Sequence, residues 1–464
     1  MTDDLTPADT IAALSTPPGQ AGIGIIRISG PSALDVARRV FRARRPDRKW
    51  RSHRLHLGTV VDPATGDEVD EILLSVMKAP LSYTREDVVE INSHSGYALL
   101  ERILNVVLDA GARQAQPGEF TLRAFLNGRI DLTQAEAVMD LIRARSERGI
   151  ELASRQLRGG LKARIEAVRE ALVGFLAHIE VAIDYPDEGY GLAPGEKAAA
   201  RVHGELLTPL EEMRAAHARG RVWVDGARVA IVGRVNVGKS SILNRLVGTD
   251  RAIVTPEPGT TRDVVEQAVQ IDGLPVRLLD TAGYRTARGA VEEIGIRLAE
   301  QCIENADLAL WVVDRSRGLE ADDRRILERC GETPTLAVAN KIDLPRRLEE
   351  AAIRDVCGEM PVVPVSALSG EGVEELARAV RKAVLAGDRG EAPSALAPNA
   401  RQKRILDQAC SHALRAVENL RAESPLEIVA LDLQDALFAL DGITGTRAHG
   451  EVLDRIFSEF CLGK

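Results

Sequence analysis

The sequence is poor in aromatic residues, which make up 3% of its 464 residues, and its five cysteines are scattered. These cysteines form no CxxC pair and no metal-ligand spacing, so we expect reduced thiols rather than a disulfide framework. The longest clean apolar stretches, such as 308–313, suit a buried strand and are too short to span a bilayer. The first ten residues hold three Asp and no Lys or Arg, unlike a secretory signal. We therefore expect a cytoplasmic protein without a membrane segment.

The remaining composition is that of a globular protein, with 45% apolar and 28% charged residues. The chain length predicts two to four domains. A formal charge of −9 argues against a nucleic-acid clamp formed by the whole protein, although average charge hides local patches. One such patch runs from Arg38 to Arg54, with nine Lys or Arg and a single acid, Asp47. A solvated loop and a contact with a phosphate backbone are both open interpretations of this run.

Three kinds of pattern follow one another along the chain. Residues 1–128 mix strand patterns at 22–28 and 71–77 with helical spacing at 99–108, which predicts an α+β domain. Residues 129–224 and 389–464 have the periodicity of long amphipathic helices. Between them, residues 225–388 alternate strands and helices, which predicts a doubly wound α/β domain inserted into the helical one. The segment 387–398 is the expected exit linker, and the expected apolar stripe of the last helical part consists of Ile405, Ala409, Leu414, Val417 and Leu420.

A phosphate-binding loop is the strongest motif in the sequence. The apolar strand 228–232 leads directly into GRVNVGKS at 233–240 and then into an apolar helix that includes Ser241, which is the context that this motif requires. Backbone N–H groups from Asn236 to Ser240, including those of Val237 and Gly238, would face the phosphates at a helix N-terminus. We expect Lys239 to contact the outer phosphates and Ser240 to bind Mg²⁺.

Three further motifs follow in the order of a Ras-like GTPase. The sequence DTAG at 280–283 places Asp280 to hold Mg²⁺ through water and Gly283 to sense the third phosphate, with Thr281 and Ala282 between them. The sequence NKID at 340–343 follows a strand, and the Asp343 carboxylate can accept hydrogen bonds from guanine N1–H and its amine, while Asn340 and Lys341 complete the motif. Ser366 and Ala367 supply the remaining base contact. The sequence therefore predicts a GTP-hydrolysing enzyme.

The hydrolytic group is not the usual one. Tyr284 stands where Ras-like switches place a water-orienting Gln, so another group must act. Glu292 is the leading candidate, and an exposed acid at a helix start is the alternative. An amide at Asn236 could hold a monovalent cation, with carbonyls of 255–257 around it, and K⁺ so placed would supply positive charge in the transition state. Thr261 suits the second hydroxyl ligand of Mg²⁺.

With these motifs in place, the chain resembles the MnmE/TrmE family of tRNA-modifying GTPases from end to end. The likeness is carried by TPPG at 16–19 with IIRISG at 25–30, by SYTREDVVE at 82–90, by PGEFTLRAFLNG at 117–128 and by FSEFCLGK at 457–464. Many families share the GTPase motifs, but this combination of flanking segments is specific. The resemblance implies a tetrahydrofolate-binding-like N-terminal α+β domain, a helical domain and an inserted Ras-like P-loop domain.

The resemblance also implies chemistry and partners. Members install an aminomethyl or carboxymethylaminomethyl group on C5 of the wobble uridine of certain tRNAs, as homodimers joined with a flavin-dependent partner of the MnmG/GidA type in a heterotetramer. The one-carbon donor is a tetrahydrofolate derivative, in the 5-formyl or methylene form. By matching positions, Arg27, Glu90 and Arg123 would bind it, with Lys464 nearby. The positions that match the family's K⁺ site are Asn236, Thr255, Glu257 and Thr260, and Glu292 matches its catalytic glutamate.

The sequence leaves two questions open. Cys461 lies where a prenylation box would, but Gly463 is not aliphatic and Lys464 is an unusual last residue, so lipid anchoring is not expected. The Cys461 thiol is either functional in the uridine chemistry or a small buried hydrophobe. The alternatives for the whole chain are a ribosome-assembly GTPase and a GTP-dependent regulatory switch. No GXXG clamp in a plausible KH pattern supports the first of these.

Overall fold

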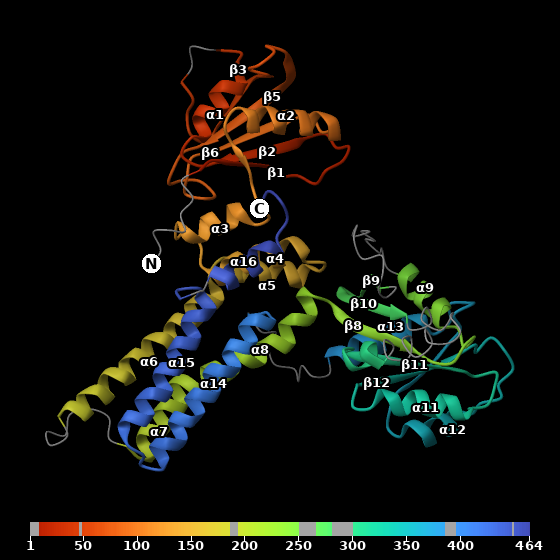
Figure 1. Ribbon diagram of the computed structural model, residues 1–464. Coiled ribbons are helices and arrows are strands. Elements are labelled where there is room, and N and C mark those ends of the chain that lie inside the picture. Colours follow the sequence, from red (N-terminus) through yellow and green to blue (C-terminus); the bar gives the residue numbers. More distant parts are fainter. Residues whose placement is uncertain are drawn as a thin grey trace, which may run out of the picture. The chain divides into compact units, whose positions relative to one another are not determined.

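The computed structural model describes residues 9–45, 49–185, 194–249, 266–280, 300–385, 396–447 and 450–464. The chain folds into two compact units, and most of their elements are labelled in Figure 1. The first unit comprises Met1–Met139, Leu157–Leu207 and Gln408–Lys464, and the second comprises Asp140–Gln156 and Thr208–Asp407. Among the described residues, no helix combines the length and the apolar character that crossing a membrane requires.

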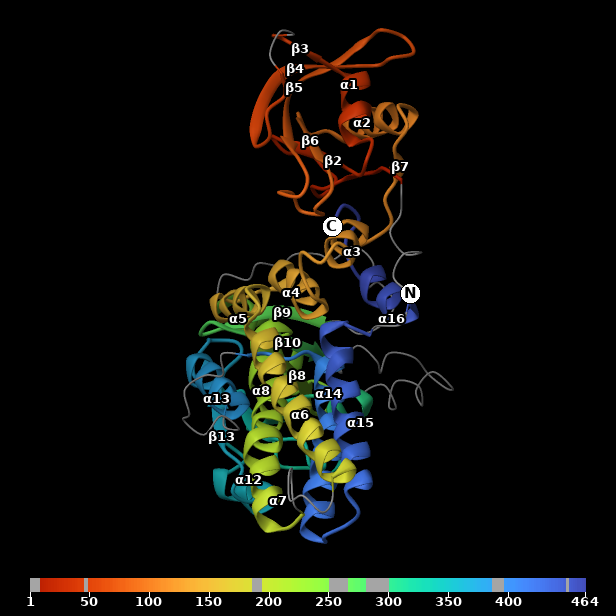
Figure 2. The same cartoon turned by 90° about the vertical axis from the view of Figure 1, so that its left-hand side faces the viewer.

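The N-terminal part of the first unit is a seven-stranded sheet in the order β3-β4-β5-β6-β2-β1-β7. Its strand pairs are antiparallel except β1 with β7. Helices α1 (Ala33–Val40) and α2 (Tyr97–Asp109) bury their apolar faces against the sheet (Figure 2), as the helical spacing at 99–108 predicted. The strands are β1 (Ile11–Leu14), β2 (Gly24–Ser29), β3 (Phe41–Ala43), β4 (Arg54–Val61), β5 (Glu68–Met77), β6 (Val88–Ser93) and β7 (Arg113–Gln114).

The rest of the first unit is helical. Two long helices, α6 (Gly160–Asp184) and α15 (Leu426–Thr444), pack along each other through apolar side chains spaced three and four residues apart. Phe457 and Phe460 close a small core beside Leu132 and Met139. The other elements are α3 (Glu119–Leu126), α4 (Leu132–Arg143), α7 (Glu196–Val202), the π-helical turn η1 (His203–Leu207) and α16 (Gly450–Ser458).

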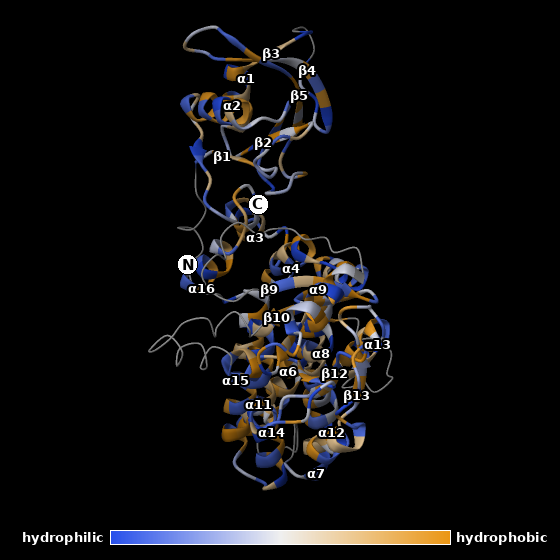
Figure 3. Ribbon diagram, turned by 90° about the vertical axis from the view of Figure 1, so that its right-hand side faces the viewer, coloured by the Kyte–Doolittle hydropathy of each residue, from blue (hydrophilic) through white to orange (hydrophobic). Residues whose placement is uncertain are grey.

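Helix α14 (Ala400–Arg421) corrects one detail of the predicted apolar stripe. Leu414 is 45% exposed, whereas Ala413 is fully buried. The buried face follows a three-and-four spacing through Leu406, Ala409, Ala413 and Leu420, and Leu414 lies one residue, about 100°, farther round the helix. Figure 3 shows hydrophilic and hydrophobic residues interspersed along the helices of the chain. The sequence favoured Leu414 for the buried face because leucine is the larger apolar residue. In the structure the small Ala413 is buried there instead.

The second unit contains a six-stranded sheet in the order β13-β12-β11-β8-β10-β9. All neighbouring strands are parallel except β9, which is antiparallel to β10. The elements of this unit are α5 (Glu147–Leu157), α8 (Thr208–Val224), β8 (Ala227–Val232), α9 (Lys239–Thr249), β9 (Glu266–Ile271), β10 (Leu274–Asp280), β11 (Leu308–Asp314), α11 (Ala321–Cys330), β12 (Thr335–Asn340), α12 (Glu350–Cys357), β13 (Val362–Val365) and α13 (Val373–Leu385).

The strand order of this sheet reverses at β8, because β10 lies on one side of it and β11 on the other. Ligands of doubly wound sheets bind at such a switch point, beyond the carboxyl ends of the strands. The glycine-rich loop 233–238 leaves β8 at this point. The predicted multidomain architecture of α/β and α+β parts is therefore confirmed, and the topology singles out the place for a site.

Candidate functional site

The loop between β8 and α9 has the backbone conformation that its glycines allow. Gly233 and Gly238 have φ angles of 150° and 98°, and Asn236 has a φ of 63°. A Cβ at Gly238 would lie 2.2 Å from Asn340 Nδ2, and one at Gly233 would lie 2.5 Å from the Val312 carbonyl oxygen. Both positions therefore require glycine for conformation and for space. The loop is shaped to present main-chain N–H groups at the start of α9.

Lys239, the first residue of α9, is 7% exposed and folds back over its own loop. Its ammonium donates to the carbonyl oxygens of Gly233 at 2.8 Å and Arg234 at 2.7 Å. The cation is thus held at the centre of the loop, where phosphate oxygens can exchange with these carbonyls. Ser240 and Ser241 follow at the start of α9, where both are exposed, and the Mg²⁺-binding role of the Ser240 hydroxyl stays a prediction.

The motif at 340–343 is bonded directly to this loop. Asn340, 1% exposed at the end of β12, donates from Nδ2 to the Val237 carbonyl at 2.7 Å. The Lys341 ammonium donates to the Asn236 carbonyl at 2.8 Å. Because β12 and β8 are separated only by β11, their carboxyl ends meet at one edge of the sheet. The structure therefore brings two motifs together that lie about a hundred residues apart in the sequence.

The residues predicted to recognise the base also lie together. Ser366 donates from its hydroxyl to Asp343 Oδ1 at 2.5 Å, and the Ala367 N–H donates to Asn340 Oδ1 at 3.1 Å. Asp343 is otherwise exposed, so its carboxylate is held in place yet accessible. An oriented carboxylate at this position can accept the paired N–H donors of guanine. Adenine has no such donor pair.

Sequence reasoning missed Asp314, the last residue of β11, which is 5% exposed. Its carboxylate accepts hydrogen bonds from Lys341 Nζ at 2.7 Å and from the Ser316 hydroxyl at 2.6 Å. Burial alone would raise the pKa of this carboxyl, but these hydrogen bonds outweigh it and hold the pKa below its ordinary value. The position of Asp314 directly after an apolar strand was the available clue, since the same rule located Asn340.

Two arginines near the loop were missed as well. Arg245, on α9, donates from Nε to the Ala367 carbonyl at 2.9 Å and thereby ties this helix to the loop that contains Ser366 and Ala367. Arg234, in the phosphate loop, pairs with Asp323 at 2.9 Å and with Glu320 at the start of α11. Both arginines fix loops of the site to neighbouring helices. Arg245 lies outside the motifs, and Arg234 occupies a variable position of the phosphate loop, so neither could be singled out from the sequence.

The remaining predicted site residues fall into two groups. Asp280 is described and ends β10 at the same edge of the sheet, next to β8. The residues that lie outside the described part of the chain are Thr255, Glu257, Thr260, Thr261, Thr281, Ala282, Gly283 and Glu292. Their predicted roles in binding Mg²⁺, K⁺ and the third phosphate, and in hydrolysis, stay predictions.

A second cluster in the first unit contains three of the four residues assigned to the folate. Arg27 and Glu90 face each other across β2 and β6, and their side chains pair at 2.8 Å. Arg27 also donates to the Gly463 carbonyl at 3.3 Å and stacks on the rings of Tyr83 and Phe120. This places the last residues of the chain beside the pair.

The last residue, Lys464, is bound through its main chain to α3, where the Phe120 N–H donates to the Lys464 carbonyl at 3.2 Å. Burial lowers the pKa of the Lys464 ammonium, Arg27 adds to this lowering, and Glu90 opposes it. Cations beside a carboxylate and two aromatic rings suit a ligand with a polar ring and an anionic tail. The chemistry of the cluster thus fits a folate.

Arg123 lies on α3, three residues after Phe120. It is 1% exposed, and its guanidinium pairs with Asp9 at 2.6 Å, with Glu119 at 3.0 Å and with Glu86 at 3.3 Å. Because these three carboxylates surround a fully buried guanidinium, Arg123 ties the chain before β1 to α3. Its placement supports a structural role and gives no support to direct contact with a ligand.

The buried cluster around Arg123 makes a testable prediction about acid stability. Glu119→Gln should lower the free energy of unfolding of the first unit by about 3 kcal/mol near pH 7, because it breaks a buried pair. Hydrogen bonds from Arg113 and Arg123 outweigh burial and lower the pKa values of Asp9 and Glu119, whose ordinary values are 3.8 and 4.5. The stabilisation is therefore complete above pH 4.5 and is lost as the pH falls through the lowered values.

Thermal unfolding of the two proteins between pH 7 and pH 3 measures this effect. The difference between the wild type and Glu119→Gln should shrink in the acid range. Glu101→Gln, which changes an exposed acid on α2, serves as the control and should behave like the wild type. A difference that stays constant down to pH 3 would contradict an ionised Glu119 in the folded state.

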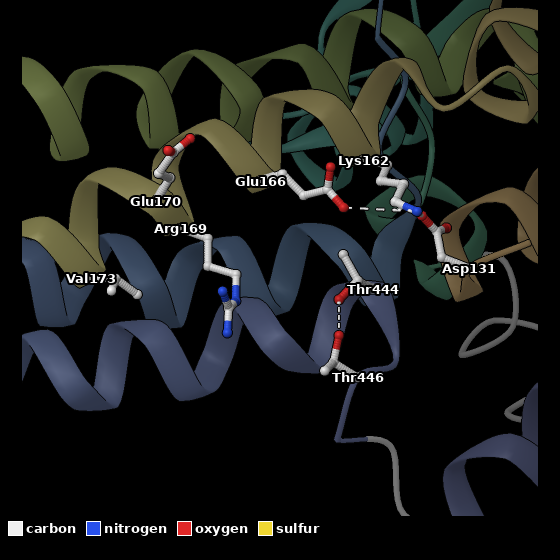
Figure 4. Close-up of a pocket in the computed structure, with 8 residues that line it drawn as sticks. All are labelled: Asp131, Lys162, Glu166, Arg169, Glu170, Val173, Thr444 and Thr446. Carbon is white, nitrogen blue, oxygen red and sulfur yellow. Dashed lines mark hydrogen bonds and ion pairs between the residues drawn. The ribbon is translucent and has the colours of Figure 1, made fainter. Parts of the chain in front are cut away.

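A hollow of about 590 Å³ on the helical part of the first unit carries charges of both signs (Figure 4). Lys162 Nζ lies 3.8 Å from Asp131 Oδ2 and 3.8 Å from Glu166 Oε1. Arg169 donates to Asp441 at 2.9 Å. None of the residues predicted for a site lines this hollow. Cys461 is likewise outside it, with an exposed thiol.

The comparisons with known proteins agree with this arrangement. A model described as the TrmE N-terminus of a GTP-binding protein matches residues 10–129, and one described as the MnmE helical domain matches residues 132–461. The tRNA modification GTPase MnmE of Carboxydothermus hydrogenoformans is 45% identical over 461 residues, which are 98% of this chain and 99% of that protein. The protein of the same name from Moorella thermoacetica is 46% identical over 98% of this chain and 99% of its own length.

Among solved structures, that of Aquifex aeolicus Era bound to GDP and aluminium fluoride is 32% identical, covers 33% of this chain and 56% of that chain, and has a TM-score of 0.28. The family models together span both units, and the relatives match over almost their full length. The chain belongs to the MnmE/TrmE family of tRNA modification GTPases.

Proposed function

We propose that this chain is the potassium-stimulated GTPase of a cytoplasmic complex that adds an aminomethyl or carboxymethylaminomethyl group to C5 of the wobble uridine of certain tRNAs. In this proposal a tetrahydrofolate derivative donates the carbon, and a flavin-dependent partner supplies the redox chemistry. The observation that carries it is the Arg27–Glu90 pair beside Gly463 and Lys464, in the same chain as a guanine-nucleotide site. Relatives named for tRNA modification support it along their whole length.

The residues of the nucleotide site have defined tasks in this proposal. Lys239 exchanges the carbonyls of its own loop for the outer phosphates, and Ser240 with Thr261 holds Mg²⁺. Asp343, oriented by Ser366, reads the guanine. Asn236, Thr255, Glu257 and Thr260 hold K⁺, whose charge substitutes for an arginine finger. Glu292 orients or deprotonates the attacking water.

The proposed organisation follows from the same resemblance. Residues 1–128 bind the folate and form the homodimer, residues 129–224 and 389–464 form the helical scaffold, and residues 225–388 form the GTPase domain. Arg27, Glu90 and Lys464 contact the folate, and two chains join two copies of the flavin-dependent partner in a heterotetramer. Nucleotide-driven approach of the GTPase domains would then regulate the modification.

Nucleoside analysis tests the proposed function directly. Deleting the gene should remove the modified wobble nucleoside from bulk tRNA, as read by mass spectrometry, and a plasmid copy should restore it. Complementation with the Lys239→Ala variant tests whether the modification requires GTPase activity or only the presence of the protein. A normal nucleoside profile together with immature ribosomal particles would favour the ribosome-assembly alternative.

The dependence on potassium is a separate prediction. Replacing about 100 mM KCl by the same concentration of NaCl should slow GTP turnover by about tenfold or more. The smaller Na⁺ ion cannot keep the same distances to a ring of carbonyl and amide oxygens. Steady-state hydrolysis in the two salts at equal ionic strength measures this effect, with Asn236→Ala in both salts as the matched variant. Equal rates in KCl and NaCl would remove K⁺ from the mechanism.

A further inference from the structure

The basic run 38–54 has no task in the function proposed so far, and the structure does not fold it as a single loop. Its start completes α1, residues 41–43 form the edge strand β3, and β4 begins at Arg54. Described residues of the run, together with Lys78, line a groove of about 650 Å³ on the N-terminal part of the first unit. Of the described residues that line this groove, the charged ones are all basic, namely Arg38, Arg42, Lys49 and Lys78.

The two lysines of this groove are available for a ligand. Both Lys49 and Lys78 are exposed, and among the described residues no carboxylate lies within ion-pair distance of either. Arg38 pairs with Asp35 at 2.6 Å and Arg42 pairs with Glu68 at 3.3 Å, with more than half of each side chain exposed. Exposed pairs of this kind contribute little free energy, so an anionic ligand can replace the acids at low cost.

Two aromatic rings, Phe41 and Trp50, hold the Arg38 side chain in position. The Trp50 ring meets Phe41 edge-on at 5.8 Å, and the Arg38 guanidinium lies 5.8 Å from the centre of the same Trp50 ring. Stacking of this kind restricts the long arginine side chain before any ligand binds. Among the described residues that line the groove, none is a buried polar side chain that could recognise a base, so its chemistry suits repeated phosphates rather than one specific base.

We propose that this groove binds the phosphate backbone of tRNA, a proposal that rests on the tRNA-modifying function above. The ligand chemistry follows from the charges, since several cations along one groove match a chain of phosphodiesters better than a single small anion. The formal charge of −9 makes such a patch necessary, because the average field of the chain repels RNA. Lys49 and Lys78 form the primary contacts, and Arg38 and Arg42 join them when their acids are released.

Binding of unfractionated tRNA by the full chain across a KCl series tests the groove. The double variant Lys49→Ala with Lys78→Ala should flatten the slope of log affinity against log salt by roughly 1.4 to 1.8, the value for two lost phosphate contacts. Glu68→Gln should act in the opposite direction and tighten binding, because it frees Arg42 from its acid. The control is Lys197→Ala with Lys382→Ala, two exposed lysines on α7 and α13, which should leave the slope unchanged.

GTP hydrolysis without tRNA should be equal in all these proteins, and it serves as the check on folding. An unchanged slope in the Lys49 and Lys78 variant overturns the groove proposal alone, as does an equal loss in the lysine control. If the wild type binds no tRNA at any salt concentration, the proposed function falls together with the groove. Lysine-dependent binding to phosphatidylglycerol vesicles, with tRNA binding unaffected, would assign the groove to a membrane surface and also overturn the proposal.

Discussion

Asp343→Asn should lower the affinity for GTP by about 10⁴-fold and make xanthosine triphosphate the preferred nucleotide. The Asp343 carboxylate accepts hydrogen bonds from two N–H groups of guanine. The Asn amide has only one acceptor oxygen, and its own N–H group would face one of the N–H groups of guanine. Xanthine carries a carbonyl in place of the exocyclic amine, so it pairs with the new amide. The effect should be large because the Ser366 hydroxyl, 2.5 Å from Asp343 Oδ1, prevents the side chain from turning away.

Equilibrium binding of fluorescent GTP and xanthosine triphosphate measures this exchange of specificity. Asp355→Asn, which changes an exposed acid on α12 of the same unit, removes the same charge outside the predicted site and should bind GTP like the wild type. Phosphate contacts should be intact in Asp343→Asn, so its hydrolysis of xanthosine triphosphate should approach the normal GTP rate. Retained preference for GTP would show that another group reads the base.

Glu292→Ala should slow GTP hydrolysis by about 10²- to 10⁴-fold and leave the dissociation constant for GTP unchanged. Tyr284 occupies the position of the usual water-orienting Gln, so the site has no second group of that kind in its motif. A carboxylate that acts only on the attacking water stabilises the transition state and not the bound nucleotide. Its loss should therefore appear entirely in the rate of the chemical step.

Single-turnover hydrolysis at saturating GTP in KCl isolates that step. Glu293→Ala is the matched control, because it removes the neighbouring acid of the same pair in the sequence. Glu292→Gln should be as slow as Glu292→Ala if the group takes a proton. It should retain part of the rate if the group only orients water. A rate loss below threefold in Glu292→Ala would return this residue to the role of an exposed helix-start acid.

The nucleotide site was predictable because its motifs are local and their places in the fold follow general rules. A strand followed by GRVNVGKS fixes the loop before α9, and parallel strands bring residues 340 and 366 to the same edge. What could not be predicted are the contacts that support the site. Arg245 bonds to a carbonyl 122 residues away, and Arg234 pairs across to α11, so both depend on how helices pack rather than on a motif.

In the N-terminal domain, the sequence also did not reveal the tertiary contacts of one predicted site residue, Arg123. Matching positions placed Arg123 together with Arg27 and Glu90, yet the fold buries Arg123 among carboxylates that include Asp9, 114 residues earlier. Residue type and sequence position do not reveal whether an arginine faces a ligand or the interior. That choice depends on which acids the tertiary fold brings near it.

Two hydrogen bonds, from Asn340 to Val237 and from Lys341 to Asn236, join the segment 340–343 to the phosphate loop. The first segment is proposed to bind the guanine base, and the loop is proposed to bind the phosphates and the monovalent ion. Two ligands that tighten the same set of bonds are coupled thermodynamically, and the coupling is reciprocal. Guanine and K⁺ should therefore raise the affinity of the protein for each other by the same factor. Selectivity for the base and selectivity for the ion would then be one property of a single bonded unit.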